Sequence, residues 1–434
     1  MPSTYRRLFR REVLDICGFI FIADIVTGVP TPIFPLYATS LGASLGFLGV
    51  ITAMLGLGRL VSALPVGMLS DRFDRKSVLI GGMVMFGVSF IAYAASPSAE
   101  WLILPRLLQA VAMVATFPLG VAYIGDVVEA RDRGAAIGVY TAAMGSGFAV
   151  GPLLGSWVGA TAGYPSAYMA GAVIAVGGAI FGAWRLVRTK SGGGKTIGSG
   201  LVDLEALRTL VREPAMLMAC VANIAMTLSM TGAIFTYFPV YARGVGISTV
   251  TIGSLFAWRS IASASGRIPM GPLSTRIPVG LTLTGVLLAE AVIDVAIART
   301  TSASFLTVLL ILEGIGFGIF LVCGQSGVAA ASGPQNRGAA VGMFWMAGSV
   351  GELFGPIALG VVAQSLGVIA VFKSVAVAVT FGAAFVAALG ALEFYRLRRV
   401  TGKNAGQSRG VDVASGDDAH HGAVAGEPLQ AGRH

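Results

Sequence analysis

The sequence predicts an all-α integral membrane protein with twelve transmembrane helices in two pseudo-symmetric six-helix bundles. Of the 434 residues, 55% are hydrophobic and only 12% are charged, and the mean hydropathy is +0.80, which is too apolar for a water-soluble domain. Apolar runs of about 20 residues, the length that crosses the core of a bilayer, recur along the chain. Motifs of the first half return in the same order in the second half, which indicates a duplicated domain.

Twelve apolar runs define the expected membrane spans, six in each half. They cover residues 14–39, 47–69, 78–96, 101–125, 135–159, 165–187, 215–242, 248–271, 279–299, 303–331, 338–364 and 368–395. The expected organisation is an N-terminal bundle at 1–187, a cytoplasmic linker at 188–214, a C-terminal bundle at 215–397 and a disordered cytoplasmic tail at 398–434. The 60 glycines and 18 prolines fit this architecture, because glycine permits close helix approach and proline is tolerated as a kink in membrane helices.

The two copies keep a constant offset of 204 residues. The motif Arg-Gly-Ala-Ala begins at Arg133 and again at Arg337. Further pairs in the same register are Gly67 and Gly271, Arg72 and Arg276, Gly138 and Gly342, Gly147 and Gly351, Gly151 and Gly355, and Pro152 and Pro356. A register kept this strictly means that each half forms the same six-helix unit.

Positive charge is concentrated in alternate connections between the spans. The net charge is +9, and basic residues gather before the first span, after even-numbered spans and in the linker. By the positive-inside rule, we expect a multi-pass protein of the cell membrane with both termini in the cytoplasm. No basic domain or aromatic-interleaved basic patch supports a nucleic-acid partner.

The sequence offers no constellation for catalysis, metal binding or a cofactor. Cys17, Cys220 and Cys323 lie in or beside apolar spans, and the three histidines, His420, His421 and His434, all lie in the tail. Gly194-Lys195-Thr196 is similar to a phosphate-binding loop but lacks the glycine that this motif needs five residues earlier, where Thr189 stands. We therefore expect neither an enzyme nor a metalloprotein.

Three motifs resemble those of the major facilitator superfamily. Residues 67–76, Gly-Met-Leu-Ser-Asp-Arg-Phe-Asp-Arg-Lys, resemble its signature loop, although Asp74 stands where a glycine is usual. Arg106-x-x-Gln109-Ala110 resembles the fourth-span motif, with Ala110 in place of glycine. Gly138, Gly147, Gly151-Pro152 and Gly155-Ser156 resemble the fifth-span motif of the drug:proton antiporter branch, with Ser156 in place of a second glycine. The resemblance covers about residues 10–397 and implies alternating access, a central cavity and proton-coupled export.

The same resemblance implies a latch on the cytoplasmic side. It assigns this role to Gly67, Asp71, Arg72, Arg75 and Lys76, with Asp126 of the next cytoplasmic connection as the partner of Arg72. The second copy has Thr275 where the first has the acid, so the latch is expected to be asymmetric. The alternative is that the basic residues only fix topology and touch lipid phosphates.

The glycine and proline positions of the fifth and eleventh spans predict close helix contacts. Glycines four residues apart leave one helix face without side chains, and a proline bends the helix by removing a backbone donor. We assign packing and gating to Gly138, Gly147, Gly151, Pro152, Gly351, Gly355 and Pro356. Because the pattern is present in both halves, simple helix packing is the alternative to a specific antiporter role.

Ionisable side chains at membrane depth are the sharpest functional signal, because a mid-span charge costs roughly 2.5–3.5 kcal/mol on translocon scales. The candidates are Asp24, Arg59, Arg106, Arg259, Glu290, Asp294, Glu313 and Glu352. In the superfamily, spans one, four, seven and ten line the cavity, so we assign Asp24, Arg106, Gln109 and Glu313 to proton coupling and the substrate cavity. Asp24 and Glu313 are both candidate partners of Arg106, and the sequence leaves the choice open.

The other candidates have weaker assignments. Glu290 and Asp294 lie in the ninth span, which is usually peripheral, so we expect a structural pair, with Asp294 facing Arg299 near the outer surface. Glu352 fits either the cavity or a helix interface. Flexible apolar and aromatic residues that suit lipophilic ligands are Met226, Met230, Phe235, Phe317, Phe320, Phe344, Trp345 and Met346.

Together these features predict a monomeric secondary transporter in the lipid bilayer. We expect proton-driven export of lipophilic or cationic small molecules, with a substrate cation and protons competing for Asp24 or Glu313. An importer or facilitator of a metabolite is the alternative within transport. A receptor or scaffold that transports nothing is the alternative from another class.

Overall fold

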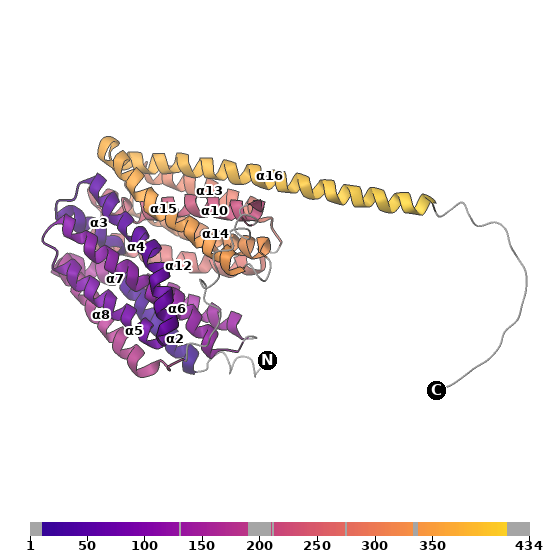
Figure 1. Ribbon diagram of the computed structural model, residues 1–434. Coiled ribbons are helices and arrows are strands. Elements are labelled where there is room, and N and C mark those ends of the chain that lie inside the picture. Colours follow the sequence, from indigo (N-terminus) through magenta and orange to yellow (C-terminus); the bar gives the residue numbers. More distant parts are fainter. Residues whose placement is uncertain are drawn as a thin grey trace, which may run out of the picture.

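The computed structural model describes residues 11–129, 132–189, 210, 212–273, 276–332 and 337–414. Within these ranges the chain is helical, without a strand (Figure 1). The first half contains α2 (Arg11–Gly28), α3 (Pro30–Ser40), α4 (Leu45–Arg72), α5 (Arg75–Ala94), η1 (Ala99–Leu102), α6 (Ile103–Val127), α7 (Arg133–Ala162) and α8 (Tyr164–Arg185). The second half contains α10 (Pro214–Thr227), the π-helix η2 (Leu228–Ile234), α11 (Phe238–Gly244), α12 (Thr249–Leu273), α13 (Val279–Ile297), α14 (Ala303–Ala331), α15 (Arg337–Leu366) and α16 (Val368–Ala414).

The helices confirm the predicted fold class. Eleven segments of the described chain are long and apolar enough to cross a membrane, including α2 with α3 as one segment and α10 through α11 as another. The one expected span that is missing from these eleven is the eighth, which corresponds to α12. This helix has 25 residues but carries Arg259, Arg267 and several serines. Its polarity is explained by its position, because α12 forms part of the wall of the central cavity.

Glycines let α7 and α15 pack directly on the backbone of a neighbouring helix. A Cβ atom at Gly151 of α7 would overlap the Ile25 carbonyl and Gly28 of α2, and one at Gly351 of α15 would overlap Thr227 of α10. A Cβ atom at Gly147 would also overlap the Phe21 carbonyl of α2, whereas one at Gly355 would be in tight contact with Leu228 of η2, at 3.1 Å. Gly138, by contrast, has open space around its Cα hydrogens, so this position makes no close helix contact.

The two halves meet through a second symmetric set of glycines. A Cβ atom at Gly49 of α4 would overlap the Pro356 carbonyl of α15, and one at Gly253 of α12 would overlap the Pro152 carbonyl of α7. Gly49 and Gly253 are themselves 204 residues apart. The duplicated register therefore builds both contacts between the halves.

The halves are joined at one end of the molecule and separate at the other. The Gly46 amide donates to Gln364 Oε1 at 3.1 Å and the Tyr237 hydroxyl donates to the Leu45 carbonyl at 3.0 Å. Among the described residues, hydrogen bonds and ion pairs between the halves all involve residues 45–59 of α4. Further along α4, side chains that are 46–70% exposed follow: Leu60, Val61, Leu64 and Met68. Figure 1 shows α3 and the start of α16 at the joined end, away from the end marked N.

Two predicted segments fall partly outside the described residues. Most of the linker, with Gly194-Lys195-Thr196, is outside them, and so are residues 415–434 with the three histidines. The described chain continues α16 to Ala414, so residues 398–414, which we expected in the tail, lie in this helix.

Candidate functional site

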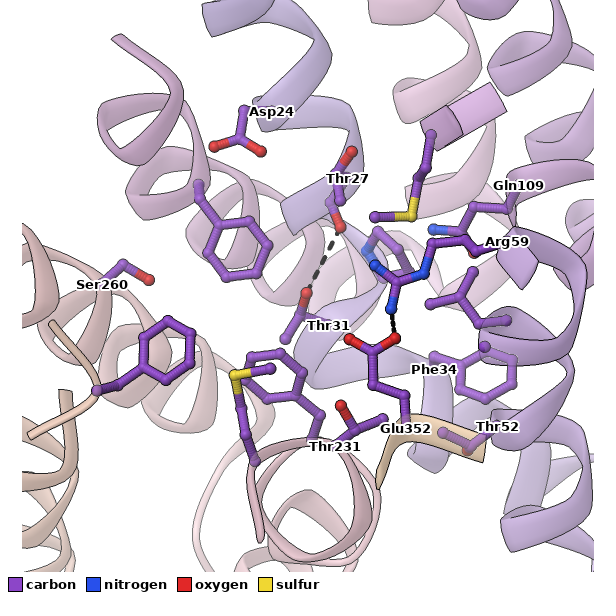
Figure 2. A pocket seen from close by; sticks show the side chains of 18 of the residues that line it. Asp24, Thr27, Thr31, Phe34, Thr52, Arg59, Gln109, Thr231, Ser260 and Glu352 are labelled. Atoms are coloured by element: carbon purple, nitrogen blue, oxygen red, sulfur yellow. Dashed lines mark hydrogen bonds and ion pairs between the residues drawn. The ribbon is translucent and has the colours of Figure 1, made fainter. Parts of the chain in front are cut away.

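A cavity of about 260 Å³ lies between the two halves (Figure 2). Its wall comes from α2, α3, α4, α6 and α7 of the first half and from η2, α12, α14 and α15 of the second. The volume is slightly below the roughly 300–1,000 Å³ of typical small-molecule sites. The charged and amide side chains in the wall are Asp24, Arg59, Arg106, Gln109, Arg259, Arg267 and Glu352.

Arg106 is buried in the cavity wall without a carboxylate partner. Its Nη1 donates to Gln109 Oε1 at 3.2 Å, and its guanidinium lies 3.9 Å from the centroid of the Phe34 ring. The Tyr93 hydroxyl donates to the same Gln109 oxygen at 2.9 Å and so fixes the amide. Arg106 Nε has no hydrogen-bond partner, and no ion pair to Arg106 occurs among the described residues. Aromatic contact and one neutral hydrogen bond therefore orient a guanidinium that retains free donors.

Asp24 lies in the wall where α2 packs on α7. A Cβ at Gly147 would touch the Asp24 Cβ, so the glycine makes room for this carboxylate. Arg267 of α12 lines the same cavity. Among the described residues Asp24 forms no ion pair, either with Arg267 or with the candidate partner Arg106.

Arg59 and Glu352 form an ion pair across the halves, from α4 to α15 (Figure 2). Their side chains are 27% and 14% exposed, and both line the cavity. From the sequence, Glu352 fits either a cavity position or a helix interface. In the structure it lines the cavity and also pairs with Arg59 of the other half. Arg59 is the last of the α4 residues, 45–59, that bond to the second half, so this pair lies where the joined end borders the cavity.

Glu313 pairs with Arg259 rather than with Arg106. Arg259 Nη2 donates to Glu313 Oε1 at 2.6 Å, and the two side chains are 4% and 0% exposed. Arg259 lines the cavity between the rings of Phe235 and Phe317, at 5.0 and 5.4 Å from their centroids. Glu313 is not part of the lining, so it lies behind the cavity wall.

Glu290 and Asp294 also lie behind the wall, fully buried on α13. The Ser229 hydroxyl of η2 is 2.7 Å from Glu290 Oε1 and 3.2 Å from Asp294 Oδ2. Asp294 is 0% exposed beside Glu290 and Ser229, and no ion pair between it and the expected partner Arg299, whose side chain is exposed, occurs among the described residues. Interior polar side chains, not a surface cation, surround it.

The expected latch residues make contacts within the first half in this conformation. Arg75 Nε donates to Asp126 Oδ2 at 2.5 Å, so Asp126 pairs with Arg75 where the resemblance implied Arg72. Lys76 Nζ donates to the Ala183 carbonyl at 2.7 Å, whereas Arg72 is exposed. Asp71 belongs to α4, and Gly67 has open space around it. These contacts hold the first bundle together at the separated end.

The cavity wall carries more positive than negative charge. Four arginines face two carboxylates in the lining. Of these, Arg59 is neutralised by Glu352 and Arg259 by Glu313 behind the wall. Arg106 and Arg267 remain against Asp24, so the wall carries an excess of one positive charge.

Aromatic side chains complete the lining. Phe148 of α7 lies 6.2 Å from Phe235 between ring centroids and bridges the halves. Met230, Phe235 and Phe317 line the cavity as the lipophilic interpretation requires, whereas Trp345 and Met346 are more than half exposed.

Arg267 of the cavity wall was not among the residues singled out from the sequence. It follows Arg259 by eight residues, with Ser263 between them, and this spacing places all three on one helix face and could have revealed it.

Two helical bundles that enclose a polar cavity define the class of multi-pass membrane transporters. The family model of the Major Facilitator Superfamily matches residues 16–277 and 232–414. The chain therefore belongs to the major facilitator superfamily.

Individual relatives are distant. An uncharacterized MFS-type transporter of Methanocaldococcus jannaschii is 23% identical over 386 residues, covering 87% of this chain and 96% of the relative. The 3-(3-hydroxy-phenyl)propionate transporter of Escherichia coli is 27% identical over 311 residues, covering 70% and 74%. Multidrug resistance protein 2 of Bacillus subtilis is 27% identical over 139 residues, covering 32% and 35%.

A solved structure shares the fold. A bacterial homolog of the human lysosomal transporter Spinster, in an inward-facing and unoccupied conformation, superposes with a TM-score of 0.75 at 16% identity, covering 90% of this chain and 98% of that one. The family and the fold are those of membrane transporters, not of enzymes.

Proposed function

We propose that this protein is an alternating-access transporter of small lipophilic carboxylates, such as aromatic acids. The observation that carries the proposal is Arg106, a buried guanidinium in the cavity wall with an unpartnered Nε. A buried charge without a counterion is costly, and a carboxylate that accepts two hydrogen bonds from one guanidinium supplies the missing partner. The excess positive charge of the wall favours the same ligand.

The aromatic lining supports a flat apolar group attached to that carboxylate. Phe34 lies against Arg106, and Phe148 and Phe235 face each other across the halves. The name of the Escherichia coli relative gives an aryl propionate as its substrate. At 27% identity this relative supports the substrate class and does not fix the individual compound.

The orientation of the cavity follows from the charge pattern. The separated end carries the basic loop between α4 and α5, which the positive-inside rule assigns to the cytoplasm. In our proposal this conformation is inward-facing, and the contacts at Gly49 and Gly253 close the outer side. Motion to the outward-facing state would break those contacts and form new ones near Asp71 and Arg72.

A charge series tests the substrate class directly. We would measure binding of 3-phenylpropionate, 3-phenylpropionamide and 3-phenylpropylamine to the purified protein by calorimetry. The anion should bind most tightly, and Arg106→Gln should weaken it by roughly 10- to 100-fold, because a hydrogen bond to a charged group contributes about 1.5–3 kcal/mol. Binding of the amide should change little.

The matched control is Arg299→Gln, which removes a positive charge from an exposed side chain outside the cavity. It should leave the charge preference intact. Stronger binding of the amine than of the propionate by the wild type would contradict the proposal.

A second candidate function is proton-coupled efflux of cationic or lipophilic compounds. Asp24 favours it, because this carboxylate lines the cavity and has no ion-pair partner among the described residues. The Bacillus subtilis multidrug resistance relative supports it over about a third of its length. Under this alternative, Asp24→Asn abolishes binding of 3-phenylpropylamine and leaves 3-phenylpropionate unaffected.

A further inference from the structure

Three carboxylates gather behind the cavity wall of the second half. Glu290 and Asp294 come from α13, and Glu313 comes from α14. All three side chains are at most 1% exposed. Glu313 holds the guanidinium of Arg259, the one cation that forms a hydrogen bond or ion pair with this cluster among the described residues. Three ionised acids beside one arginine would leave two uncompensated charges in the membrane interior, which is strongly unfavourable.

The hydrogen-bond geometry at Ser229 favours a proton on the pair. The hydroxyl oxygen lies 2.7 Å from Glu290 Oε1 and 3.2 Å from Asp294 Oδ2. A serine hydroxyl has one hydrogen to donate, whereas ionised carboxylates only accept. If both carboxyl groups are ionised, the two contacts share this one hydrogen, whereas a protonated carboxyl group that donates to Ser229 gives each contact a hydrogen of its own.

Within the described part of the chain, no other charged group forms a hydrogen bond or ion pair with Glu290 or Asp294. Besides α14, the helices α10 and α16 pack on α13. The sequence of α10, residues 214–227, has no charged side chain, and Lys373 of α16 is exposed. From α12, Arg259 is the group that faces the cluster, and it is held by Glu313. Asp294 Oδ1 has no partner, which leaves one oxygen free to accept or release a proton.

Ser229 lies in a π-helical turn, η2, which continues towards the cavity residues Met230, Thr231 and Phe235. Single π-helical turns inside longer helices are frequent at functional sites. The same short segment therefore contacts the acid pair with one side chain and the cavity with others. This continuity connects the buried cluster to the proposed substrate site.

We propose that Glu290, Asp294 and Ser229 form a proton-binding site outside the substrate cavity, linked to the cavity through Glu313 and Arg259. A substrate carboxylate bound to Arg106 adds a negative charge to the cavity, which attracts Arg259 of the same lining and weakens its hold on Glu313. A second proton, taken from water, then forms an O–H bond on a carboxylate oxygen of the cluster that is still ionised, and this removes one further negative charge. Proton and anion therefore bind with positive cooperativity and move in the same direction. The link to substrate rests on the proposed function, whereas the proton site does not.

Infrared spectroscopy of the purified protein near neutral pH tests the proton site without any substrate. The wild type should show the carbonyl band of a buried carboxylic acid, and the double variant Glu290→Gln with Asp294→Asn should lose it. Glu100→Gln changes an exposed acid of η1 and should retain the band. An unchanged band in the double variant overturns the proposal.

Ser229→Ala provides a second measurement if the double variant does not fold. It keeps both acids and removes the shared hydroxyl, so the carbonyl band should shift in frequency. A band at the wild-type position would mean that Ser229 does not bond a protonated carboxyl, and that result also overturns the proton site.

The link to the cavity is tested by the pH dependence of 3-phenylpropionate binding between about pH 6 and 8, where the probe is an anion. One linked proton strengthens wild-type binding by up to about tenfold for each unit of falling pH. The double variant should bind the probe with little pH dependence. An equal pH dependence in both proteins overturns the link. A wild type that does not bind the probe contradicts the proposed function, and the infrared result still decides the proton site.

Discussion

The two halves of the chain share their packing positions but differ in their charges. Gly49 and Gly253 occupy equivalent places, and each lies against the carbonyl of an equivalent proline in the other half. By contrast, Arg106 of the first half has no acidic partner in the described part of the chain, whereas Arg259 of the second half is paired with Glu313. The backbone contacts at these glycines are therefore symmetric, whereas the pairing of charged side chains differs between the halves.

The difference follows from what each position touches. A glycine against a backbone carbonyl has no alternative, because any Cβ would overlap the oxygen, so both copies keep it. A side chain that faces a cavity touches ligand, water or other side chains, and its identity can diverge without loss of packing. The first half supplies an unpaired arginine and an unpaired acid, and the second supplies a buried acid cluster.

The largest effect is expected from the paired charges of the second half. Glu313→Gln leaves Arg259 buried without a counterion and should lower the free energy of unfolding by about 3–5 kcal/mol. Glu352→Gln should cost less, because the side chains of the Arg59–Glu352 pair are 27% and 14% exposed and retain some hydration. Equilibrium unfolding in detergent measures both, and Glu313→Gln combined with Arg259→Gln should recover part of the loss. Equal costs for the two single variants would contradict this difference between the pairs.

A smaller effect is expected from the symmetric glycines. Gly49→Val and Gly253→Val should each destabilise the joined end by about 1–3 kcal/mol through overpacking. The distance between spin labels at Ser40 and Leu366 should then broaden towards longer values in both variants. Gly81→Val, on a helix face with open space, is the matched control and should change nothing. A response to only one of the two substitutions would show that the halves do not share the closure equally.

The smallest effect is expected at the start of α5, where Asp74 replaces the usual glycine. Its carboxylate accepts from the Ser77 amide at 3.0 Å and the Ser77 hydroxyl at 2.7 Å, an N-cap that Pro278 cannot provide at the equivalent start of α13. Asp74→Ala should therefore cost about 1 kcal/mol of stability in unfolding measurements. The corresponding change Pro278→Ala removes no capping hydrogen bond, so it should not lower stability through the loss of a cap.

The cap also has a defined pH dependence. Burial opposes ionisation of Asp74, but hydrogen bonds from Ser77 and the charges of Arg188 and Lys76 outweigh it, so the pKa lies below its ordinary value. An acid whose pKa is lowered on folding stabilises the protein above its ordinary pKa and loses this contribution as the pH falls through the folded value. Unfolding below about pH 4 should be easier for the wild type than at pH 6, with a weaker dependence in Asp74→Asn. An identical dependence would exclude this role.

The sequence predicted the cavity residues only in part. Asp24, Arg106 and Gln109 line the cavity as expected from their spans, because helix number in this fold determines which helices face the centre. Glu313 does not line the cavity, because its side chain points to Arg259 behind the wall. The position of a residue within its span does not determine the direction of its side chain, so the sequence could not choose between Arg106 and Arg259 as the partner. The Arg59–Glu352 pair joins two halves and could not be found from local spacing.

Hydropathy, the 204-residue repeat and the glycine pattern by themselves determined the helices and the close contacts of α7 and α15 at Gly147, Gly151 and Gly351. These properties are local or periodic, and a bilayer allows few other ways to satisfy the backbone. Only the tertiary structure decided which charges are paired, because partners hundreds of residues apart meet through helix packing. Among the described residues it left Arg106 in the cavity wall without an ion-pair partner and placed Glu290 and Asp294 around one hydroxyl.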